Sequence, residues 1–230
     1  MQAAENQDYV SVSEYLVAEA ASAVRHEYPG GLVSAMAGET RDHNQMVGNL
    51  LYAIRRQVKG TADQVPMIDI RVNLQFLNGE CFYSPDLVVT GDQRDSEERF
   101  IRYPKLIVEV LSESTERVDR HEKFFAYTQI ETLEEYVLVA PSGREVMPHT
   151  AAGARPSGRS SVHLQPERWG TPARWVSSWP LRSERRAPTA VTVFRRADNW
   201  KGETVTDTKG SVALKSLRLE VPLAEIYEGV

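Results

Sequence analysis

The feature that most constrains this chain is an almost unbroken apolar run, Leu106 to Leu111, that contains a single carboxylate, Glu109. Such a run is typical of a central strand that is buried on both faces. An ionised carboxylate in that setting is costly unless a cation or a paired base compensates it. The run therefore predicts that Glu109 has a cationic partner. Two alternatives remain open: an edge strand with Glu109 facing water, or a buried structural ion pair.

A second carboxylate, Asp86, lies in the strand-like run from Cys81 to Thr90. Pro85 removes a ladder donor, so we expect the strand to be interrupted or bulged at Asp86, which would aim the side chain into a cleft. Two carboxylates on neighbouring strands repel each other until a divalent cation binds. We therefore interpret Asp86 and Glu109 as ligands of Mg²⁺ or Mn²⁺. The alternative is that Pro85-Asp86 marks an ordinary turn.

A third element follows directly along the chain. Ser112 to Thr115 supplies residue types that cap helices, and Glu116 to Ile130 reads as a helix. Asp119 and Lys123 are four residues apart and share one helix face, from which the lysine could point back over the strand ends. The alternative is a solvated ion pair on the helix surface.

These residues occur in an order that resembles the PD-(D/E)XK nuclease superfamily and, more closely, the Uma-type putative restriction endonuclease family. The resemblance runs from about Tyr9 to Pro141 and resumes from about Val191 to Tyr227. It depends on the following motifs: Arg25–Tyr28, Ala35–Gly38, His43-Asn44, Pro85-Asp86, Tyr103–Ser112, Lys123, Leu133–Val139 and Leu223–Tyr227.

The resemblance implies an α/β fold of the restriction-endonuclease type, with a mixed sheet flanked by helices and a C-terminal extension of antiparallel strands. It also implies metal-dependent cleavage of a phosphodiester, with DNA as the expected partner. Asp86, Glu109 and Lys123 are the implied catalytic residues, and a backbone carbonyl such as that of Val110 would complete the metal site. Leu111 departs from the wider superfamily, which has a lysine there; in the Uma-type pattern Lys123 substitutes for it.

Four further residues are candidate accessory groups: Glu27, His43, Ser112 and Asp119. In the resembled family an acid at the position of Glu27 approaches the catalytic site; an exposed charge at a strand end is the alternative. His43 opens a helix, and a helix N-terminus lowers the affinity of an imidazole for protons, which predicts a neutral donor to a phosphate or to water. A plain cap or surface contact is the alternative for His43.

The remaining periodicities predict the rest of the sheet and its helices. We expect a helix with a capping box at Ser11–Glu14 running to about Ala23, a hairpin formed by Arg25–Tyr28 and Leu32–Ala37, and a helix from Asp42 to Val58. Strand predictions follow at Val65–Leu77, Cys81–Thr90 and Glu134–Ala140, with a polar loop at Gly91–Arg102. Ala190–Arg196, Trp200–Thr206 and Ser211–Leu219 read as short antiparallel strands, and Pro222–Tyr227 as a final helical turn.

The chain changes character after Pro141. Residues 142–188 contain eight arginines, no lysine, three acids, six of the twelve prolines and three of the four tryptophans. We interpret 1–141 as the endonuclease-like core, 142–188 as a poorly ordered basic insertion, and 189–230 as strands that complete the same domain. A segment that holds single strands through phosphate contacts and base stacking is the alternative interpretation of 142–188.

Composition sets outer limits on function. A chain of 230 residues that is 41% hydrophobic can bury a real core. It has no long apolar run and no charged-then-apolar leader, so we expect neither membrane insertion nor secretion. One cysteine, Cys81, excludes an internal disulfide framework and fits the cytoplasm. A net charge of −5 argues mildly against a broad basic footprint for nucleic acid, and a homodimer is left open.

Two other classes of function stay open from the residues alone. One is a catalytically inactive module that binds nucleic acid or another partner and keeps the nuclease-like fold; Leu111 and the negative net charge favour it. The other is a hydrolase of a different phosphorylated substrate, because fold does not fix function. The sequence gives no target specificity and does not separate DNA from RNA.

Overall fold

The computed structural model describes residues 9–67, 70–76, 79–112, 114–141 and 189–230. The predicted insertion at 142–188 therefore lies outside the described residues, and its interpretation stays a prediction.

The predicted α/β fold with a mixed sheet is confirmed. A central five-stranded sheet has the order β10-β9-β8-β7-β5, in which β7 (Leu106–Val110) and β8 (Glu135–Ala140) are parallel. The neighbours β5 (Leu87–Val89), β9 (Ala190–Arg195) and β10 (Gly202–Val205) pair antiparallel. The register places Glu109 opposite Leu138 in the middle of this sheet.

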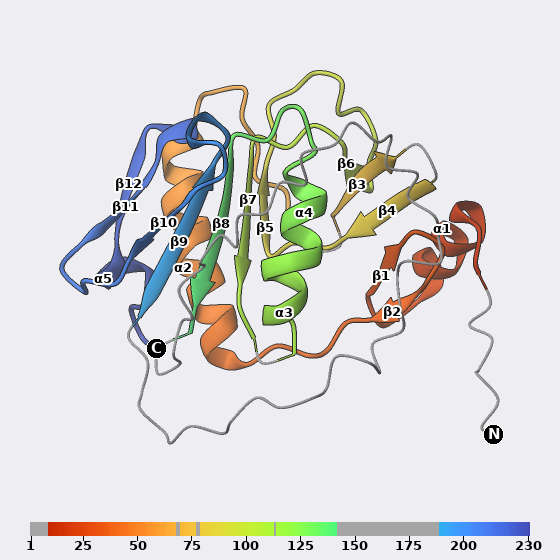
Figure 1. Ribbon diagram of the computed structural model, residues 1–230, viewed down its shortest axis with the longest axis horizontal. Helices are drawn as coiled ribbons and strands as arrows, with labels where there is room; N and C mark the ends of the chain where they lie inside the picture. The colour runs from red at the N-terminus through yellow and green to blue at the C-terminus, as the bar shows by residue number, and fades with distance from the viewer. Residues whose placement is uncertain (1–8, 68–69, 77–78, 113, 142–188) are drawn as a thin grey trace, which may run out of the picture.

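Helices cover both faces of the central sheet (Figure 1). The long helix α2 (Arg41–Val58) packs behind it against Leu106, Val108 and Val110. The segment from α3 to α4 lies in front, over Ile107 and Leu111. Since side chains alternate between the faces of a strand, Glu109 points to the front face with Ile107 and Leu111. The strand itself thus aims the carboxylate at the segment that carries Lys123.

That segment is not the single α-helix that the sequence predicts. It is divided into α3 (Glu116–Val118), a π-helical turn η1 (Asp119–Lys123) and α4 (Phe124–Tyr127). Asp119, Arg120 and Lys123 within the π-turn are buried. π-Turns interrupt helices most often at functional sites, because the wider turn re-aims side chains. The alternative of a solvated Asp119–Lys123 pair is therefore wrong.

A second sheet lies beside the first, with the order β2-β1-β4-β3-β6. It contains the hairpin of β3 (Arg71–Phe76) and β4 (Gly79–Tyr83), the short pair β1 (His26–Pro29) and β2 (Ser34–Ala35), and β6 (Phe100–Ile101), which is parallel to β3. Helix α1 (Val12–Ala21) starts at the predicted capping box, in which Ser11 and Glu14 bond reciprocally. Its Tyr15 stacks on Tyr28 and contacts Phe82, which fixes α1 and β1 against the sheet.

The C-terminal residues form the predicted strand extension with one correction. Ser211–Leu219 is not one strand: β11 (Ser211–Leu214) is followed by a 3-10 turn η5 (Lys215–Leu217) and then by β12 (Leu219–Pro222), which pairs antiparallel with β11. Arg218 adopts φ 51°, the left-handed conformation that reverses the chain. A second 3-10 turn, η4 (Arg196–Asp198), links β9 to β10, and α5 (Leu223–Ile226) ends the fold.

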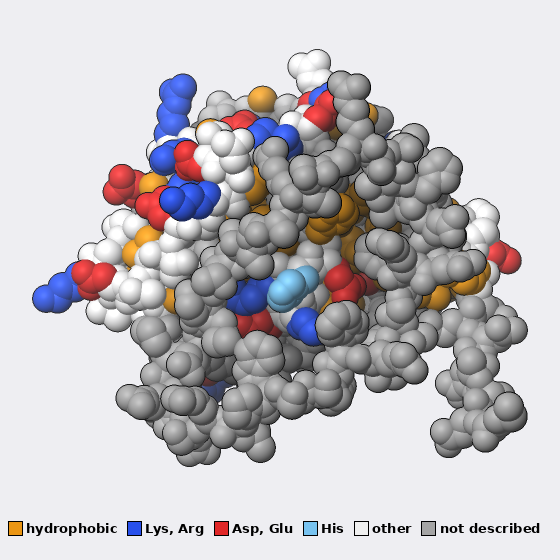
Figure 2. Space-filling view, in the orientation of Figure 1, with side chains coloured by type: hydrophobic (Ala, Val, Ile, Leu, Met, Phe, Trp, Pro, Cys, Tyr) orange, Lys and Arg blue, Asp and Glu red, His pale blue; other side chains and the backbone are white. Residues whose placement is uncertain are grey.

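The extension is bound to the back of the core. Asn49 and Gln57 on α2 donate hydrogen bonds to the main-chain oxygens of Ile226 and Leu217, both at 3.0 Å. Basic and acidic side chains intermingle over the C-terminal strands on the face seen in Figure 2. In the part of the chain that the structure describes, no helix combines the length and the apolar character that crossing a membrane requires.

Candidate functional site

Asp86 lies where the chain passes from one sheet to the other. Strand β4 ends at Tyr83 in the second sheet, β5 begins at Leu87 in the central sheet, and Pro85 stands in the link, so the predicted strand interruption is confirmed. The Val110 main-chain N–H donates to Asp86 Oδ2 at 2.7 Å. The Asp86 N–H in turn donates to Glu109 Oε2 at 3.3 Å. These two bonds fix both carboxylates at the end of β7.

Glu109 is 3% exposed, which rules out an edge strand with the carboxylate in water. Its Oε1 accepts from Lys123 Nζ at 3.1 Å and from the Tyr127 hydroxyl at 3.4 Å. Since the Asp86 N–H donates to Oε2, each oxygen of the Glu109 carboxylate accepts at least one hydrogen bond. The structure therefore brings Asp86, Glu109 and Lys123 together, from three elements that are separate in sequence.

Lys123 is the cationic centre of the cluster. Its Nζ lies 2.8 Å from Glu27 Oε1, 3.0 Å from Asp119 Oδ1 and 3.1 Å from Glu109 Oε1. An ammonium has three donors, and here each faces a carboxylate. Burial disfavours the charged form, but the three carboxylates outweigh burial and raise the pKa of Lys123. The lysine is thus held charged, 3% exposed, against the front of the sheet.

The carboxylates of the cluster outnumber its one lysine, and the pKa values of two of them, Glu109 and Asp119, are raised. Burial raises the pKa of Glu109 well above its ordinary value; Lys123 opposes that shift, and Asp119, Asp86 and Glu27 add to it. Burial likewise raises the pKa of Asp119, again opposed by Lys123. One ammonium does not neutralise four neighbouring carboxylates, so Glu109 and Asp119 bind protons more tightly than ordinary carboxyl groups do.

His43 joins the cluster from the first turn of α2, where Thr40 is the N-cap. Its Nε2 lies 3.2 Å from Asp86 Oδ2 and 3.5 Å from Glu39 Oε2. Burial favours the neutral ring, but the hydrogen bond and charge of Asp86, with the charge of Glu39, outweigh it and raise the pKa of His43. The expectation of a histidine kept neutral by the helix N-terminus is therefore wrong in direction, because two carboxylates distant in sequence dominate.

Glu39 is the residue of this site that sequence reasoning missed. It lies in the link before α2, where no periodicity marks it, and its position four residues before His43 is the only signal that the sequence offers. Burial raises the pKa of Glu39, opposed by His43. Ser112 is placed differently from the other accessory candidates: its hydroxyl lies 3.0 Å from those of Ser114 and Thr115 and organises the turn that precedes α3.

Comparisons with known proteins identify the family of the chain and its fold. Residues 12–173 match the sequence model of the Uma2 family, described as "Putative restriction endonuclease". The chain belongs to the Uma2 family. The match covers more than half of the chain and extends past Pro141 into the segment 142–188.

Two curated relatives come from Synechocystis sp., and both carry the name "Uncharacterized protein". The protein slr1290 is 35% identical over 138 residues, which are 60% of this chain and 72% of slr1290. The protein sll1609 is 28% identical over 133 residues, 56% of this chain and 74% of sll1609. Among solved structures, a protein from Anabaena variabilis described as a putative nuclease belonging to DUF820 superposes with a TM-score of 0.61. It is 13% identical over 95% of this chain and 97% of its own, which supports the fold alone.

The donor set of this Uma2 family member can be compared with what a divalent cation needs. Among the described residues, no group of three or more His, Cys, Asp or Glu side chains is arranged to hold a metal ion. Asp86 and Glu109 are neighbours at the end of β7, where the Asp86 main-chain N–H donates to Glu109 Oε2. Hard cations prefer carboxylate and carbonyl oxygens, and the excess of negative charge around Lys123 is what such an ion would relieve. In residue chemistry and charge, Asp86 and Glu109 therefore fit Mg²⁺ or Mn²⁺.

Proposed function

We propose that this Uma2 family protein is a metal-dependent endonuclease that hydrolyses phosphodiester bonds in DNA. The observation that supports the proposal is the cluster itself: a buried lysine, two carboxylates at a strand end and a surplus of negative charge, in a chain whose family carries the description "Putative restriction endonuclease". A structural ion pair would need one carboxylate for the lysine. Three within 3.1 Å of one nitrogen are costly to bury unless the site has a further cationic ligand.

Asp86 and Glu109 would hold the Mg²⁺ or Mn²⁺ ion, with the main-chain carbonyl of Val110 as a third oxygen. A divalent cation there would supply a Lewis acid that neutralises charge on the phosphate and lowers the pKa of water. Asp86 is suited to ligation because the Val110 N–H, at 2.7 Å from Oδ2, fixes the orientation of its carboxylate.

Lys123 would orient the attacking water or stabilise charge that develops on the phosphate oxygens. Since all three of its donors face carboxylates, donation to substrate requires one contact to open. Glu109 is the partner that the cation would share, so its contact is the one that we expect to open. Glu27 and Asp119 would keep the ammonium in place, at 2.8 and 3.0 Å.

Three positioning residues complete the proposal. Glu27 accepts a hydrogen bond from the Ser84 N–H at 3.4 Å, which ties it to the link that carries Asp86. His43 would steady Asp86 from the helix side, and Glu39 would steady His43. Protonated His43 would also present positive charge to a bound phosphate.

The test is incubation of the purified protein with supercoiled plasmid, single-stranded DNA and a matched RNA, each in Mg²⁺, Mn²⁺ or chelator. We expect cleavage of DNA with either metal and none with chelator. Asp86→Asn and Lys123→Met should abolish cleavage, whereas Glu220→Gln, an exposed carboxylate on β12, should leave it unchanged. Binding without cleavage in every metal would overturn the proposal in favour of the inactive nucleic-acid-binding module. Cleavage of RNA alone would overturn the assignment of DNA.

A further inference from the structure

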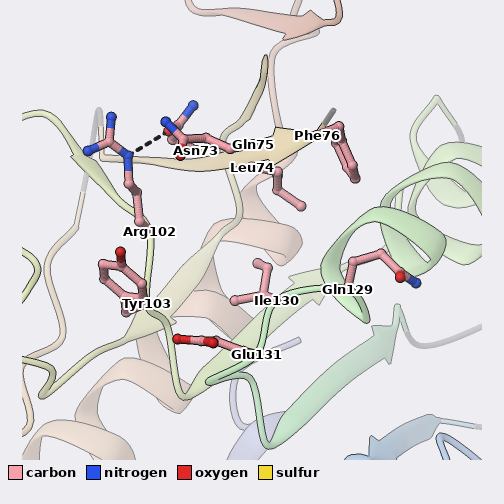
Figure 3. A pocket seen from close by; sticks show the side chains of 9 residues that line it. All are labelled: Asn73, Leu74, Gln75, Phe76, Arg102, Tyr103, Gln129, Ile130 and Glu131. Atoms are coloured by element: carbon pink, nitrogen blue, oxygen red, sulfur yellow. Dashed lines mark hydrogen bonds between the residues drawn. The ribbon is translucent and has the colours of Figure 1, made fainter. Parts of the chain in front are cut away.

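A cavity of about 380 Å³ is lined by none of the residues of the acidic cluster. Three segments form it: Asn73–Phe76 in β3, Arg102-Tyr103 after β6, and Gln129–Glu131 after α4 (Figure 3). Tyr103 and Glu109 are six residues apart along the chain that forms β7. A strand of six residues spans at most about 20 Å, which equals about six base steps of a duplex. One bound nucleic acid can therefore reach both places.

One side of the cavity is apolar. Figure 3 shows the side chains of Leu74 and Ile130 pointing toward one another, with the ring of Phe76 beside them. Leu74 is 3% exposed and Ile130 8% exposed, so both are fixed by core packing. Because Leu74 and Ile130 are almost fully buried, the surface open to a flat ring comes mainly from the half-buried ring of Phe76, beside the fixed apolar wall that they form.

The opposite side is polar, and its main cation is preset. The Arg102 Nε–H donates to Asn73 Oδ1 at 2.9 Å, and the guanidinium lies over the Phe100 ring with 4.8 Å to the centroid. Asn73 is 2% exposed, and its amide nitrogen donates to Glu80 at 2.9 Å, so its orientation is set from within the fold. The terminal nitrogens of Arg102 make no hydrogen bond of 3.5 Å or less within the described residues. One of them, Nη1, lies 3.9 Å from Glu97 Oε1 in an ion pair that is partly open to solvent, so a ligand can compete for it.

An aromatic ring separates the two sides. Tyr103 has the guanidinium of Arg94 3.8 Å from its ring centroid, and Arg94 is in turn bound by Glu131 at 2.7 Å. The main chain of Tyr103 is fixed as well, because its N–H donates to Asp95 and its carbonyl accepts from Thr90. A ring immobilised in this way stacks on a ligand with little loss of conformational entropy.

The edge of β3 adds main-chain groups to the same cavity. Its pairing with β6 stops at Val72, while its pairing with β4 continues to Phe76. From Asn73 onward, the side of β3 that faces the cavity has no strand partner among the described residues. An unpaired strand edge presents N–H donors and C=O acceptors side by side, and the exposed side chain of Gln75 adds an amide.

An apolar surface, a fixed ring and a polar edge of alternating donors and acceptors match a nucleobase. The base has apolar faces that stack on aromatic rings, and its edge carries hydrogen-bonding groups that arginine and amide side chains read. A bare phosphate would use the Arg102 guanidinium but neither the Tyr103 ring nor the apolar side of the cavity, so these two features favour a base. We infer that the cavity between β3, Arg102-Tyr103 and Gln129–Glu131 binds an unstacked nucleobase. The inference rests on the proposed function in one respect, since it takes the bound base to be part of the nucleic-acid substrate. A free mononucleotide is the other possible source of the base.

The test measures binding in chelator, where no cleavage occurs. The probes are the four deoxynucleosides, the four deoxynucleoside monophosphates, inorganic phosphate, and a fluorescent single-stranded oligonucleotide with or without abasic positions. We expect deoxynucleosides to bind without a phosphate, and abasic positions to weaken the oligonucleotide. Tyr103→Leu should weaken both by about 5- to 150-fold, the range that removal of one stacking aromatic gives. Tyr52→Leu is the matched control. The guanidinium of Arg56 also lies over the Tyr52 ring, 5.6 Å from its centroid, but this pair is on α2 and not in the cavity.

If Tyr103→Leu fails to fold, Gln75→Leu replaces it as the test variant, because Gln75 is exposed and its substitution should not disturb the core. Binding of phosphate but not of deoxynucleosides, or equal weakening by Tyr52→Leu, would overturn the inference. Binding of monomers with no effect of abasic positions would assign the site to free mononucleotides. Cleavage of DNA by a wild-type protein that binds no base refutes this inference alone. Base binding by a protein that cleaves nothing in any metal refutes the proposed function alone.

Discussion

Asp86→Asn is the change that best separates a metal site from a structural ion pair. The substitution keeps the shape of the side chain. In the wild type the Val110 N–H donates to Asp86 Oδ2 at 2.7 Å, and the amide oxygen of asparagine can accept the same bond. What it removes is one negative charge from a cluster that has too many. It should therefore abolish metal binding without breaking the fold.

The magnitude in the metal-free protein follows from two opposing contacts. Burial raises the pKa of Glu109, and the charge of Asp86 adds to that shift. Two carboxylates about 4 to 8 Å apart repel by about 2 to 4 kcal/mol at an effective dielectric constant of about 20, and Asp86→Asn relieves such repulsion at Glu109. Against this stands the contact of Asp86 with His43 Nε2 at 3.2 Å. A hydrogen bond to a charged group contributes about 1.5 to 3 kcal/mol. The two effects nearly cancel while His43 is protonated, and the relief of repulsion prevails once His43 is neutral.

The metal response sets the larger difference. A ligand at 100 times its dissociation constant stabilises the folded state by about 2.7 kcal/mol, which raises the melting temperature of a chain of this size by about 5 to 10 °C. The assay is a set of thermal scans of wild type and Asp86→Asn at pH 6 and pH 9, each with chelator and with excess Mn²⁺. We expect the wild type to gain several degrees with Mn²⁺ and the variant to gain little. In chelator the variant should be level with the wild type at pH 6 and more stable at pH 9.

Two results would refute this reasoning. An equal Mn²⁺ response in both proteins would remove Asp86 from the ligand set. A variant destabilised by about 3 to 5 kcal/mol in chelator at both pH values would identify a structural ion pair whose partner was left buried and unpaired. Glu220→Gln, which removes an exposed carboxylate from β12, controls for the change in net charge.

Three further predictions test other parts of the structure. Lys123→Met leaves the buried carboxylates of Glu109 and Asp119 and the partly buried one of Glu27 without their ammonium, so we expect a loss of about 3 to 5 kcal/mol at neutral pH and less in acid. A loss below about 1 kcal/mol in urea unfolding would indicate a solvated pair. Because the pKa of Glu109 is raised, the folded state holds a proton at pH values where the unfolded chain has released it. The free energy of unfolding of the chelated protein should therefore fall as the pH rises from about 4.5, the ordinary pKa of glutamate. Glu109→Gln should reduce this dependence of the unfolding free energy on pH. Replacing 142–188 by a short linker between Pro141 and Thr189 should preserve cooperative unfolding, since Ala140 and Ala190 are paired neighbours in β8 and β9; loss of the cooperative transition would show that the segment is structural.

The sequence predicted the parts of the fold that local chemistry determines. The apolar run at Leu106–Leu111 could hardly be other than a central strand, and Pro85 could not continue a ladder, so both the buried strand and the break before Asp86 were predictable. The C-terminal strands were found for the same reason. The turn within Ser211–Leu219 was missed because Arg218 has none of the composition of a turn and yet adopts φ 51°.

What the sequence could not predict depends on partners that meet only after folding. The proton affinity of His43 was misjudged because the helix N-terminus was visible in the sequence, whereas the carboxylates of Asp86 and Glu39 that surround the ring were not. Glu39 itself has no period, cap or motif to mark it. In both cases the deciding term is electrostatic and acts between residues from separate elements, which a single sequence does not place.

The π-turn is the clearest case in which tertiary structure overrides a local pattern, and it connects fold to function. A regular α-helix through Glu116–Ile130 would satisfy its own hydrogen bonds, so the extra residue in the turn must be stabilised from outside. The structure shows such stabilisation. The Tyr136 hydroxyl donates to the Asp119 carbonyl at 3.0 Å, and Lys123 in the turn contacts Glu27 on β1 and Glu109 on β7. The same contacts that hold the turn open hold the ammonium beside Glu109. We therefore expect the turn to shorten to a regular helix if the charged cluster is removed, because the contacts of the site, and not the helix itself, position Lys123.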